Sequence, residues 1–231
     1  MANFEVGRRW CFVGGILILF SYGVCADDSQ PFTDQRKPVR ELVTREQLER
    51  LEAGKVVLSK KGSKDEKGND RGRARAMVLV EKPPQVLWDC IRNYKEQPEY
   101  MPYLVKAEKY FEKGNRVGLQ QTLRVLYKEV TYHIIQTFDH ENKYMTWRID
   151  TTRENDIENT EGSWRFVEYG PGRTVAIYTV SVDSGMSIPG FLANFLLNQD
   201  VPKVVKALKE RAESDDKWRK HWANSGQPDE S

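Results

Sequence analysis

The chain has 231 residues, with 36 lysines and arginines against 34 aspartates and glutamates, for a formal net charge of +2. A chain so close to neutral lacks the basic excess that is typical of nucleic-acid binding, so we expect no nucleic-acid partner. Its length suits one domain with short extensions.

The N-terminus has the layout of a secretory signal peptide over residues 1–26. Arg8 and Arg9 precede an apolar stretch from Trp10 to Ala26, and the polar Asp27 follows. A positive region, an apolar core and small residues at the cleavage position direct export. The apolar stretch has 17 residues, whereas about 20 are needed to span a bilayer. We therefore expect an exported protein, periplasmic or secreted.

Two alternatives for this segment stay open. The first is a retained N-terminal membrane anchor. The second is a lipoprotein modified at Cys25, although residues 22–24 are a poor match to the sequence that usually precedes a lipidated cysteine. After cleavage at residue 26, Cys90 is the one remaining cysteine, which excludes an internal disulfide.

Residues 27–54 are predicted to be an N-terminal extension with one short helix. Thr44 and Gln47 form a capping-box pattern, and Gly54 ends a helix over residues 45–53. Residues 56–58 are then predicted to form a strand.

Residues 59–73 contain no large apolar side chain and many charges. We expect them to form a solvated, mobile loop. Their lysines and arginines also fit a transient contact with an anionic membrane surface.

Residues 75–81 are predicted to form a strand. Pro83 and Pro84 end it and open a helix of about two turns, in which Cys90 is a small core residue. Pro98 and Pro102 break the compact segment that follows.

Between residues 104 and 183 the apolar period becomes two, which is typical of strands. Short turns such as residues 170–172 join successive strands, so neighbouring strands are expected to be antiparallel. Only one face of the sheet is expected to be covered by a helix. The predicted strands are 104–112, 116–127, 129–139, 143–151, 161–169 and 173–183.

One face of these strands is unusually aromatic and also includes Gln121 and Gln136. A buried amide without a partner costs about 1–3 kcal/mol. The two glutamines are therefore expected at a rim, bonded to each other, or facing a cavity. The opposite face carries residues expected in water: Arg124, Lys128, Glu129, Arg148, Asp150 and Arg165.

Pro189 begins a long helical stretch to about Ser214, and Pro202 is expected to kink it or divide it in two. Residues 214–231 are predicted to be a charged, disordered tail. In this tail Trp218 and Trp222 lie four residues apart, which suits a membrane interface or packing back on the domain.

The segment VLWDCIRNYKEQPEYMPYL, residues 86–104, resembles a pattern of the START-like superfamily, in its polyketide cyclase/dehydrase and coenzyme Q-binding branch. The resemblance covers about residues 55–213, although Asn93 stands where many relatives carry aspartate. It implies an α+β helix-grip fold, in which a curved antiparallel sheet wraps around a long C-terminal helix with an apolar cavity between them. Further matching segments are 162–166, 172–174 and 188–189.

The resemblance implies that this cavity binds an apolar small molecule. The predicted lining residues are Trp88, Leu119, Gln121, Leu123, Tyr132, Ile134, Gln136, Met145, Trp147, Trp164, Phe166, Tyr178, Phe191 and Phe195. The predicted mouth residues are Tyr94, Tyr100, Met101, Tyr103 and Pro189.

No pattern in the sequence indicates a catalytic or metal site. Three separate histidines and Cys90 do not form a zinc motif, and phosphate-loop, dinucleotide and nucleophile-elbow motifs are absent. The carboxylates between Asp150 and Glu161 are better explained as a solvated loop than as a calcium or acid–base site. We therefore predict no catalytic residue, no metal and no cofactor.

The sequence thus predicts an exported carrier of a lipid, sterol or quinone, with Gln121, Gln136 or Tyr132 orienting the head group. One alternative is a polyketide cyclase/dehydrase-type enzyme that uses the same cavity. The other is a partner-binding module that uses Trp218, Trp222 and the basic loop as its contact surface.

Overall fold

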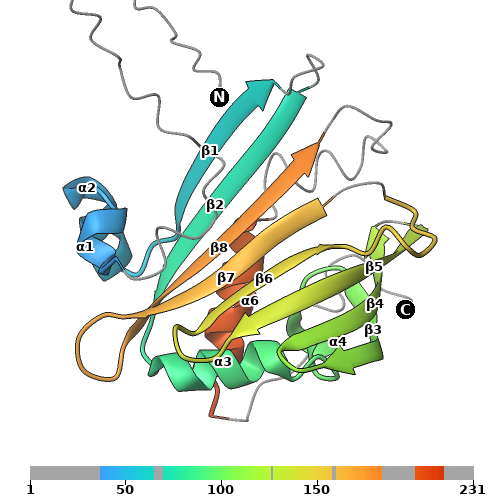
Figure 1. Cartoon of the computed structure of the whole chain (residues 1–231). Helices are drawn as coiled ribbons and strands as arrows, with labels where there is room; N and C mark the ends of the chain where they lie inside the picture. Colours follow the sequence, from blue (N-terminus) through green and yellow to red (C-terminus); the bar gives the residue numbers. More distant parts are fainter. Residues whose placement is uncertain (1–36, 65–69, 126, 158–159, 184–200, 216–231) are drawn as a thin grey trace, which may run out of the picture. The chain divides into compact units, whose positions relative to one another are not determined.

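The computed structural model describes residues 37–64, 70–125, 127–157, 160–183 and 201–215, all within the compact unit of residues 34–231 (Figure 1). None of the helices in these ranges is long and apolar enough to cross a membrane. The helices are α1 (Val39–Leu42), α2 (Arg45–Glu52), α3 (Pro84–Arg92), α4 (Gln97–Tyr100) and α6 (Val201–Glu213). The strands are β1 (Val57–Lys64), β2 (Asp70–Val80), β3 (Leu104–Lys113), β4 (Arg116–Val125), β5 (Lys128–Asp139), β6 (Tyr144–Ile149), β7 (Thr160–Glu168) and β8 (Thr174–Asp183).

The strands form one antiparallel sheet in the order β1-β2-β8-β7-β6-β5-β4-β3. From β3 to β8 each strand pairs with its successor along the chain, and β2 pairs with β8. Figure 1 shows this sheet curving, with α6 behind its central strands and α3 crossing below them. The predicted α+β class and antiparallel meander are confirmed.

The sheet face toward α6, called here the inner face, holds the main core. On β5 the side chains alternate, so that every second residue from Val130 to Phe138 is buried. These residues pack in one cluster with α6, to which Val204, Val205 and Leu208 contribute. On β5 the alternation expected from the sequence is therefore confirmed, because a period of two places alternate side chains on opposite faces of a sheet.

The prediction that helices cover one face of the sheet is wrong. Residues of α1 and α2 pack on the opposite, outer face and form a second core with β1, β2, β7 and β8. Leu51 of α2 is 1% exposed in this core, where it joins the outward-facing residues Met77 and Ile177. The predicted capping box is present: Gln47 N donates to the Thr44 hydroxyl at 3.2 Å, and Thr44 N donates to Gln47 Oε1 at 3.0 Å.

Arg165 was expected in water, and that expectation is wrong. It lies on the outer face of β7 beside the second core and is 7% exposed. Its guanidinium donates a hydrogen bond to the Lys37 carbonyl oxygen at 2.7 Å. The residues that lead into α1 therefore cover this arginine, and the hydrogen bond offsets part of the cost of burying a cation.

The predicted loop over residues 59–73 is also wrong for most of its length. Residues 57–64 pair with residues 70–77 as β1 and β2, in register from Val57 opposite Met77 to Lys64 opposite Asp70. Backbone ladder hydrogen bonds hold such a ribbon together and do not require large apolar side chains. For this reason the hydrophobic pattern missed it.

The long C-terminal helix is described from Val201 onward. Pro202 lies in the first turn of α6, where a proline is tolerated because the first helical N–H groups have no intrahelical partner. Residues 189–200 and the tail tryptophans Trp218 and Trp222 lie outside the described residues, so a kink or division of the helical stretch at Pro202 stays a prediction.

Candidate functional site

Four aromatic rings from three neighbouring strands form a continuous surface on the inner face. Trp147 of β6 stacks on Tyr178 of β8, with ring centroids 5.4 Å apart and 20° between planes. Tyr178 contacts Trp164 of β7 at 4.7 Å, and Trp164 stacks on Phe166 at 5.8 Å. This surface, the aromatic shelf, consists of Trp147, Tyr178, Trp164 and Phe166.

Gly162 allows the Trp147 ring to reach across the sheet. Trp147 and Gly162 are cross-strand partners on β6 and β7, and β8 lies beyond. A Cβ atom at residue 162 would lie 2.1 Å from Trp147 Cζ2 and 2.4 Å from the Thr179 carbonyl oxygen. The indole therefore lies over the backbone of Gly162, in space that any other side chain would occupy.

The first of the two predicted glutamines is paired. Tyr132 of β5 lies opposite Gln121 of β4, and its hydroxyl donates to Gln121 Oε1 at 3.1 Å. Both side chains are buried, and burial raises the pKa of Tyr132. The Tyr132 hydroxyl thus has a partner in the Gln121 carbonyl oxygen, which is a pairing that the sequence did not predict.

The second glutamine has a different environment. Gln136 is 4% exposed and lies between Val117 of β4 and Trp147 of β6 on the inner face. Within the part of the chain that the structure describes, no group hydrogen-bonds its side-chain amide. Gln136 is thus a polar side chain on a mostly apolar part of the inner face, and it is a candidate contact for a bound molecule.

Other protein groups surround the Tyr178 hydroxyl, but the side chain is partly accessible. Burial raises the pKa of Tyr178, and the nearby Tyr132 raises it further. Part of the side chain nevertheless remains accessible, and so does part of Trp147. Trp147 and Tyr178 are therefore the residues of the shelf that a bound molecule could contact, and the cavity itself stays a prediction.

Trp88 differs from the shelf tryptophans in its surroundings. It lies on α3, is 1% exposed, and meets Phe138 at 5.6 Å and Phe166 at 6.4 Å, edge to face. Lys143 Nζ lies 5.8 Å from its ring centre. The structure therefore places Trp88 in packed core between α3 and the sheet.

The other predicted lining residues fall into two groups. Phe191 and Phe195 lie outside the described residues. The remaining apolar ones are buried on the inner face: Leu119, Leu123, Ile134 and Met145.

The predicted mouth residues lie around α4 and the start of β3, except Pro189, which lies outside the described residues. Tyr100 is buried, and its hydroxyl donates to the Cys90 carbonyl oxygen at 3.1 Å. Tyr103 adopts a positive φ of 64°, and Lys203 of α6 donates to its hydroxyl at 3.3 Å. A non-glycine residue in this region is strained by about 1–2 kcal/mol, so contacts on both sides hold Tyr103 in place. Tyr94 and Met101 are partly buried against the same core.

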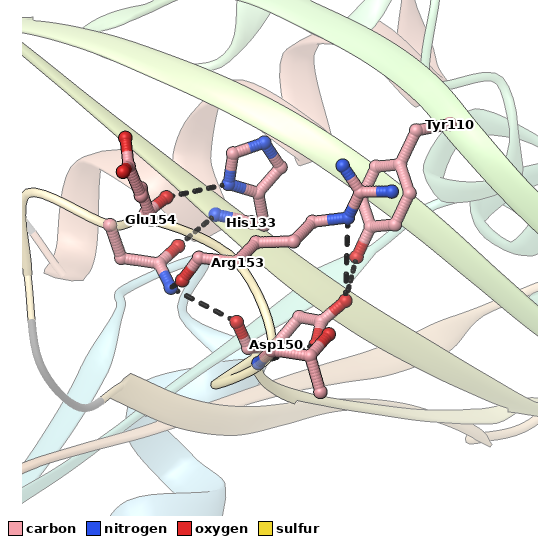
Figure 2. Close-up of polar contacts among 7 residues, drawn as sticks. Tyr110, His133, Asp150, Arg153 and Glu154 are labelled. Carbon is pink, nitrogen blue, oxygen red and sulfur yellow. Dashed lines mark hydrogen bonds and ion pairs between the residues drawn. The ribbon is translucent and has the colours of Figure 1, made fainter.

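Two of the carboxylates after β6, Asp150 and Asp156, accept hydrogen bonds from the neighbouring strands β3 and β5. Figure 2 shows Tyr110 of β3 and His133 of β5 facing residues 150–155 on the outer face. The Tyr110 hydroxyl donates to Asp150 Oδ2 at 2.7 Å, and the Arg153 guanidinium lies 3.9 Å from the Tyr110 ring centre. Asp156 accepts from the Thr131 backbone N–H at 2.7 Å. Within the described residues no group of His, Cys, Asp or Glu side chains could hold a metal ion.

Replacing Tyr110 by phenylalanine should destabilise the fold by about 1 kcal/mol at neutral pH, because one hydrogen bond to an ionised group is lost. The Thr152 hydroxyl, and also the Tyr110 hydroxyl, hold the pKa of Asp150 below its ordinary value of 3.8. A carboxyl whose folded pKa is lowered contributes stability above its unfolded pKa and loses it as the pH falls through the folded value. The difference from wild type should therefore shrink below about pH 4. Urea unfolding at several pH values measures it.

Tyr127→Phe is the matched control, because Tyr127 is 93% exposed. This variant should unfold like the wild type at every pH. A difference between Tyr110→Phe and wild type that stays constant down to about pH 2 would show that the ionised Asp150 is not what the hydroxyl stabilises.

The family described as polyketide cyclase/dehydrase and lipid transport matches residues 80–209 of this chain, from the last residue of β2 into α6. The matched range contains the aromatic shelf, Gln121 and Gln136. No curated protein is significantly similar in sequence.

Several solved structures share the fold. The Zhui aromatase/cyclase from Streptomyces sp. R1128 has a TM-score of 0.55 at 16% identity, covering 62% of this chain and 94% of its own. A STAR-related lipid transfer protein from Xanthomonas axonopodis has 0.51 at 16%, covering 66% and 98%. Human STARD10 has 0.55 at 11%, covering 69% and 75%. These similarities confirm the helix-grip fold, and the family match confirms the resemblance to the polyketide cyclase/dehydrase branch.

Proposed function

The chain belongs to the polyketide cyclase/dehydrase and lipid transport family, and from this we propose that it is an exported carrier of an apolar small molecule. The observation that carries the proposal is the aromatic shelf on the inner face, of which Trp147 and Tyr178 are partly accessible, with the polar Gln136 beside it. Such a surface, mostly apolar with a few polar groups, is typical of small-molecule sites.

A carrier only has to remove its apolar ligand from water, and no covalent bond forms or breaks. Each square ångström of apolar ligand surface that leaves water contributes about 25 cal/mol. The shelf and the apolar side of α6 supply the surroundings for it. Lipid transport in the family description and in the name of the Xanthomonas protein supports this reading.

The enzyme alternative requires a catalytic base among the same residues. Burial raises the pKa values of Tyr132 and Tyr178, so both hydroxyls keep their protons at neutral pH and act as donors. A cyclase or dehydrase step that removes a proton needs a base whose pKa lies near the working pH. The described tyrosines do not supply one, which favours carriage.

Lipid extraction and native mass spectrometry of the protein purified from its own compartment test the carrier. We expect a co-purifying lipid, sterol or quinone on the wild-type chain and its loss on Trp147→Ala. Repeated isolation of the chain with no bound apolar molecule, together with no binding in vitro, would contradict the proposal. Turnover of a polyketide that is lost on Tyr132→Phe would establish the enzyme instead.

Export rests on the signal-peptide layout of residues 1–26. A lipid needs a carrier in the aqueous space beyond the inner membrane, which fits an exported apolar-ligand protein. N-terminal sequencing of the mature protein tests this: a chain that begins at Asp27 supports export with cleavage. A chain that keeps its first 26 residues would favour a membrane-anchored carrier.

A further inference from the structure

We propose that β1 and β2 present a docking surface for the anionic surface of a phospholipid bilayer. This docking surface, the basic patch, consists of Lys61 on β1 and Arg71, Arg73 and Arg75 on β2. The two strands form one edge of the sheet (Figure 1) and precede residue 80, at which the match to the family begins. The proposal goes beyond the carrier function, because it concerns the opposite face of the sheet from the aromatic shelf.

Strand pairing brings the four residues of the basic patch onto one face. Met77 of β2 belongs to the second core on the outer face. Because side chains alternate along a strand, Arg75, Arg73 and Arg71 occupy outer-face positions on the same strand. Lys61 of β1 lies directly opposite Arg73 in the register, so it occupies the outer face as well. Two basic segments that are separate in the sequence thus meet in one surface.

Positive charge is concentrated on these two strands. Together β1 and β2 carry six lysines and arginines against one aspartate, which gives a net charge of +5. The whole chain has a net charge of +2, so the rest of the chain is net negative. A cluster of one sign within a nearly neutral protein creates a local positive potential, which attracts an anionic partner to this edge of the sheet.

The register places like charges side by side in the basic patch. Lys61 and Arg73 are direct cross-strand partners, and Arg71 and Arg75 flank Arg73 on the same face. Like charges that face each other across two strands destabilise a sheet. Arg73 is nevertheless exposed, and its Nε donates to the Ser181 hydroxyl at 3.1 Å. A bound anionic surface would relieve this repulsion.

The length and the polarity of the basic patch favour a bilayer over other anionic partners. Successive outer-face positions on a strand lie about 7 Å apart, so Arg71 and Arg75 are separated by about 14 Å and meet several headgroups instead of one phosphate. A protein partner would need an apolar centre in its interface, whereas lysines and arginines suffice for attraction to anionic lipid. The residues opposite the patch on β1 and β8 are polar: Ser59, Ser63, Thr179, Ser181 and Asp183.

Vesicle sedimentation with the full chain tests the proposal. We expect tighter binding to phosphatidylcholine vesicles that contain about one quarter phosphatidylglycerol than to phosphatidylcholine alone, and about 1 M salt should abolish the difference by screening. Lys61→Gln/Arg73→Gln should weaken the preference for anionic vesicles about 25-fold, because each cation near an anionic membrane contributes about fivefold. Every variant keeps the N-terminal apolar segment, so a difference between variants reports the patch.

Lys113→Gln/Arg116→Gln is the matched control. Lys113 and Arg116 are also direct cross-strand partners and are exposed, but they lie on β3 and β4 at the other edge of the sheet. This variant removes the same charge and should bind anionic vesicles like the wild type. Urea unfolding should show no substantial loss of stability in Lys61→Gln/Arg73→Gln, because the substitutions remove a pair of like charges.

Equal losses of vesicle binding in the two double variants would overturn the proposal, because net charge and not the patch would then decide binding. Equal binding of the wild type to both vesicle types would overturn it as well. Tighter binding to a short DNA duplex than to anionic vesicles would replace the bilayer by a nucleic acid as the partner. A chain that binds anionic vesicles but no apolar molecule would keep this inference and contradict the carrier function.

Discussion

Gly162→Ala is expected to displace the Trp147 ring and reduce apolar-ligand binding by at least about tenfold. A Cβ atom at residue 162 would lie 2.1 Å from Trp147 Cζ2, far closer than van der Waals contact. The indole could move away, but the Thr179 carbonyl oxygen, at 2.4 Å, belongs to the backbone of β8 and cannot. The variant must therefore shift β7 relative to β8 as well, and overpacking of this kind costs about 1–3 kcal/mol.

Three measurements test the expected losses of stability, of the Trp147 stack and of ligand binding. Urea unfolding reports the loss of stability, and near-ultraviolet circular dichroism reports the loss of the Trp147 stack on Tyr178. Equilibrium dialysis with an apolar probe, 2-methylnaphthalene, then shows whether the shelf is the site. We expect all three to change in Gly162→Ala.

Gly118→Ala is the matched control for the opposite face. A Cβ atom there would lie 2.6 Å from Tyr110 Cζ on the outer face, so this variant should lose stability while it keeps ligand binding. If both glycine variants lose binding in proportion to stability, the effect of Gly162 would be general and not a property of the shelf.

The sequence predicted the inner face well because that face obeys a simple period. Alternate residues of β4 to β8 point to one side, and a one-residue error in register would expose the whole apolar set. The pattern therefore determines which residues are buried, as the alternation along β5 shows. It does not determine which cross-strand neighbours they meet.

Gln121 and Gln136 show this limit. Both lie on the inner face, and the sequence predicted the same environment for both of them. The register places Gln121 opposite Tyr132, which bonds it, and Gln136 between Val117 and Trp147, which do not. Only the pairing of β4, β5 and β6 shows that the carbonyl oxygen of Gln121 accepts a hydrogen bond from Tyr132 whereas Gln136 has no such neighbour.

The outer core could have been predicted from a signal in the sequence. Residues 76–80 of β2 are apolar without interruption, and so are Val175 to Ile177 of β8. A strand that is apolar on both sides is expected to be covered on both sides. Leu48 and Leu51 of α2 supply the matching stripe. The charged residues of β1 and β2 show no apolar pattern that would predict this pairing, although backbone hydrogen bonds suffice to form it.

Trp88→Ala is expected to lower the free energy of unfolding by about 3–5 kcal/mol, the usual cost of removing a buried aromatic side chain. Trp88 joins α3 to the sheet through its edge-to-face contacts with Phe138 and Phe166. It is 1% exposed, so a cavity of nearly its full volume would remain. Urea unfolding of the purified variant measures the loss.

Trp147→Phe provides the comparison, because Trp147 is partly exposed and phenylalanine keeps a ring over Gly162. We expect it to cost less stability than Trp88→Ala, because it removes fewer atoms from a side chain that is already partly exposed, while apolar-ligand binding falls. Trp88→Ala should thus mainly reduce stability, whereas Trp147→Phe should mainly reduce ligand binding. If Trp88→Ala kept its stability but lost the ligand, Trp88 would line the site as the resemblance implied, and the packed contacts with Phe138 and Phe166 would have to open when the ligand binds.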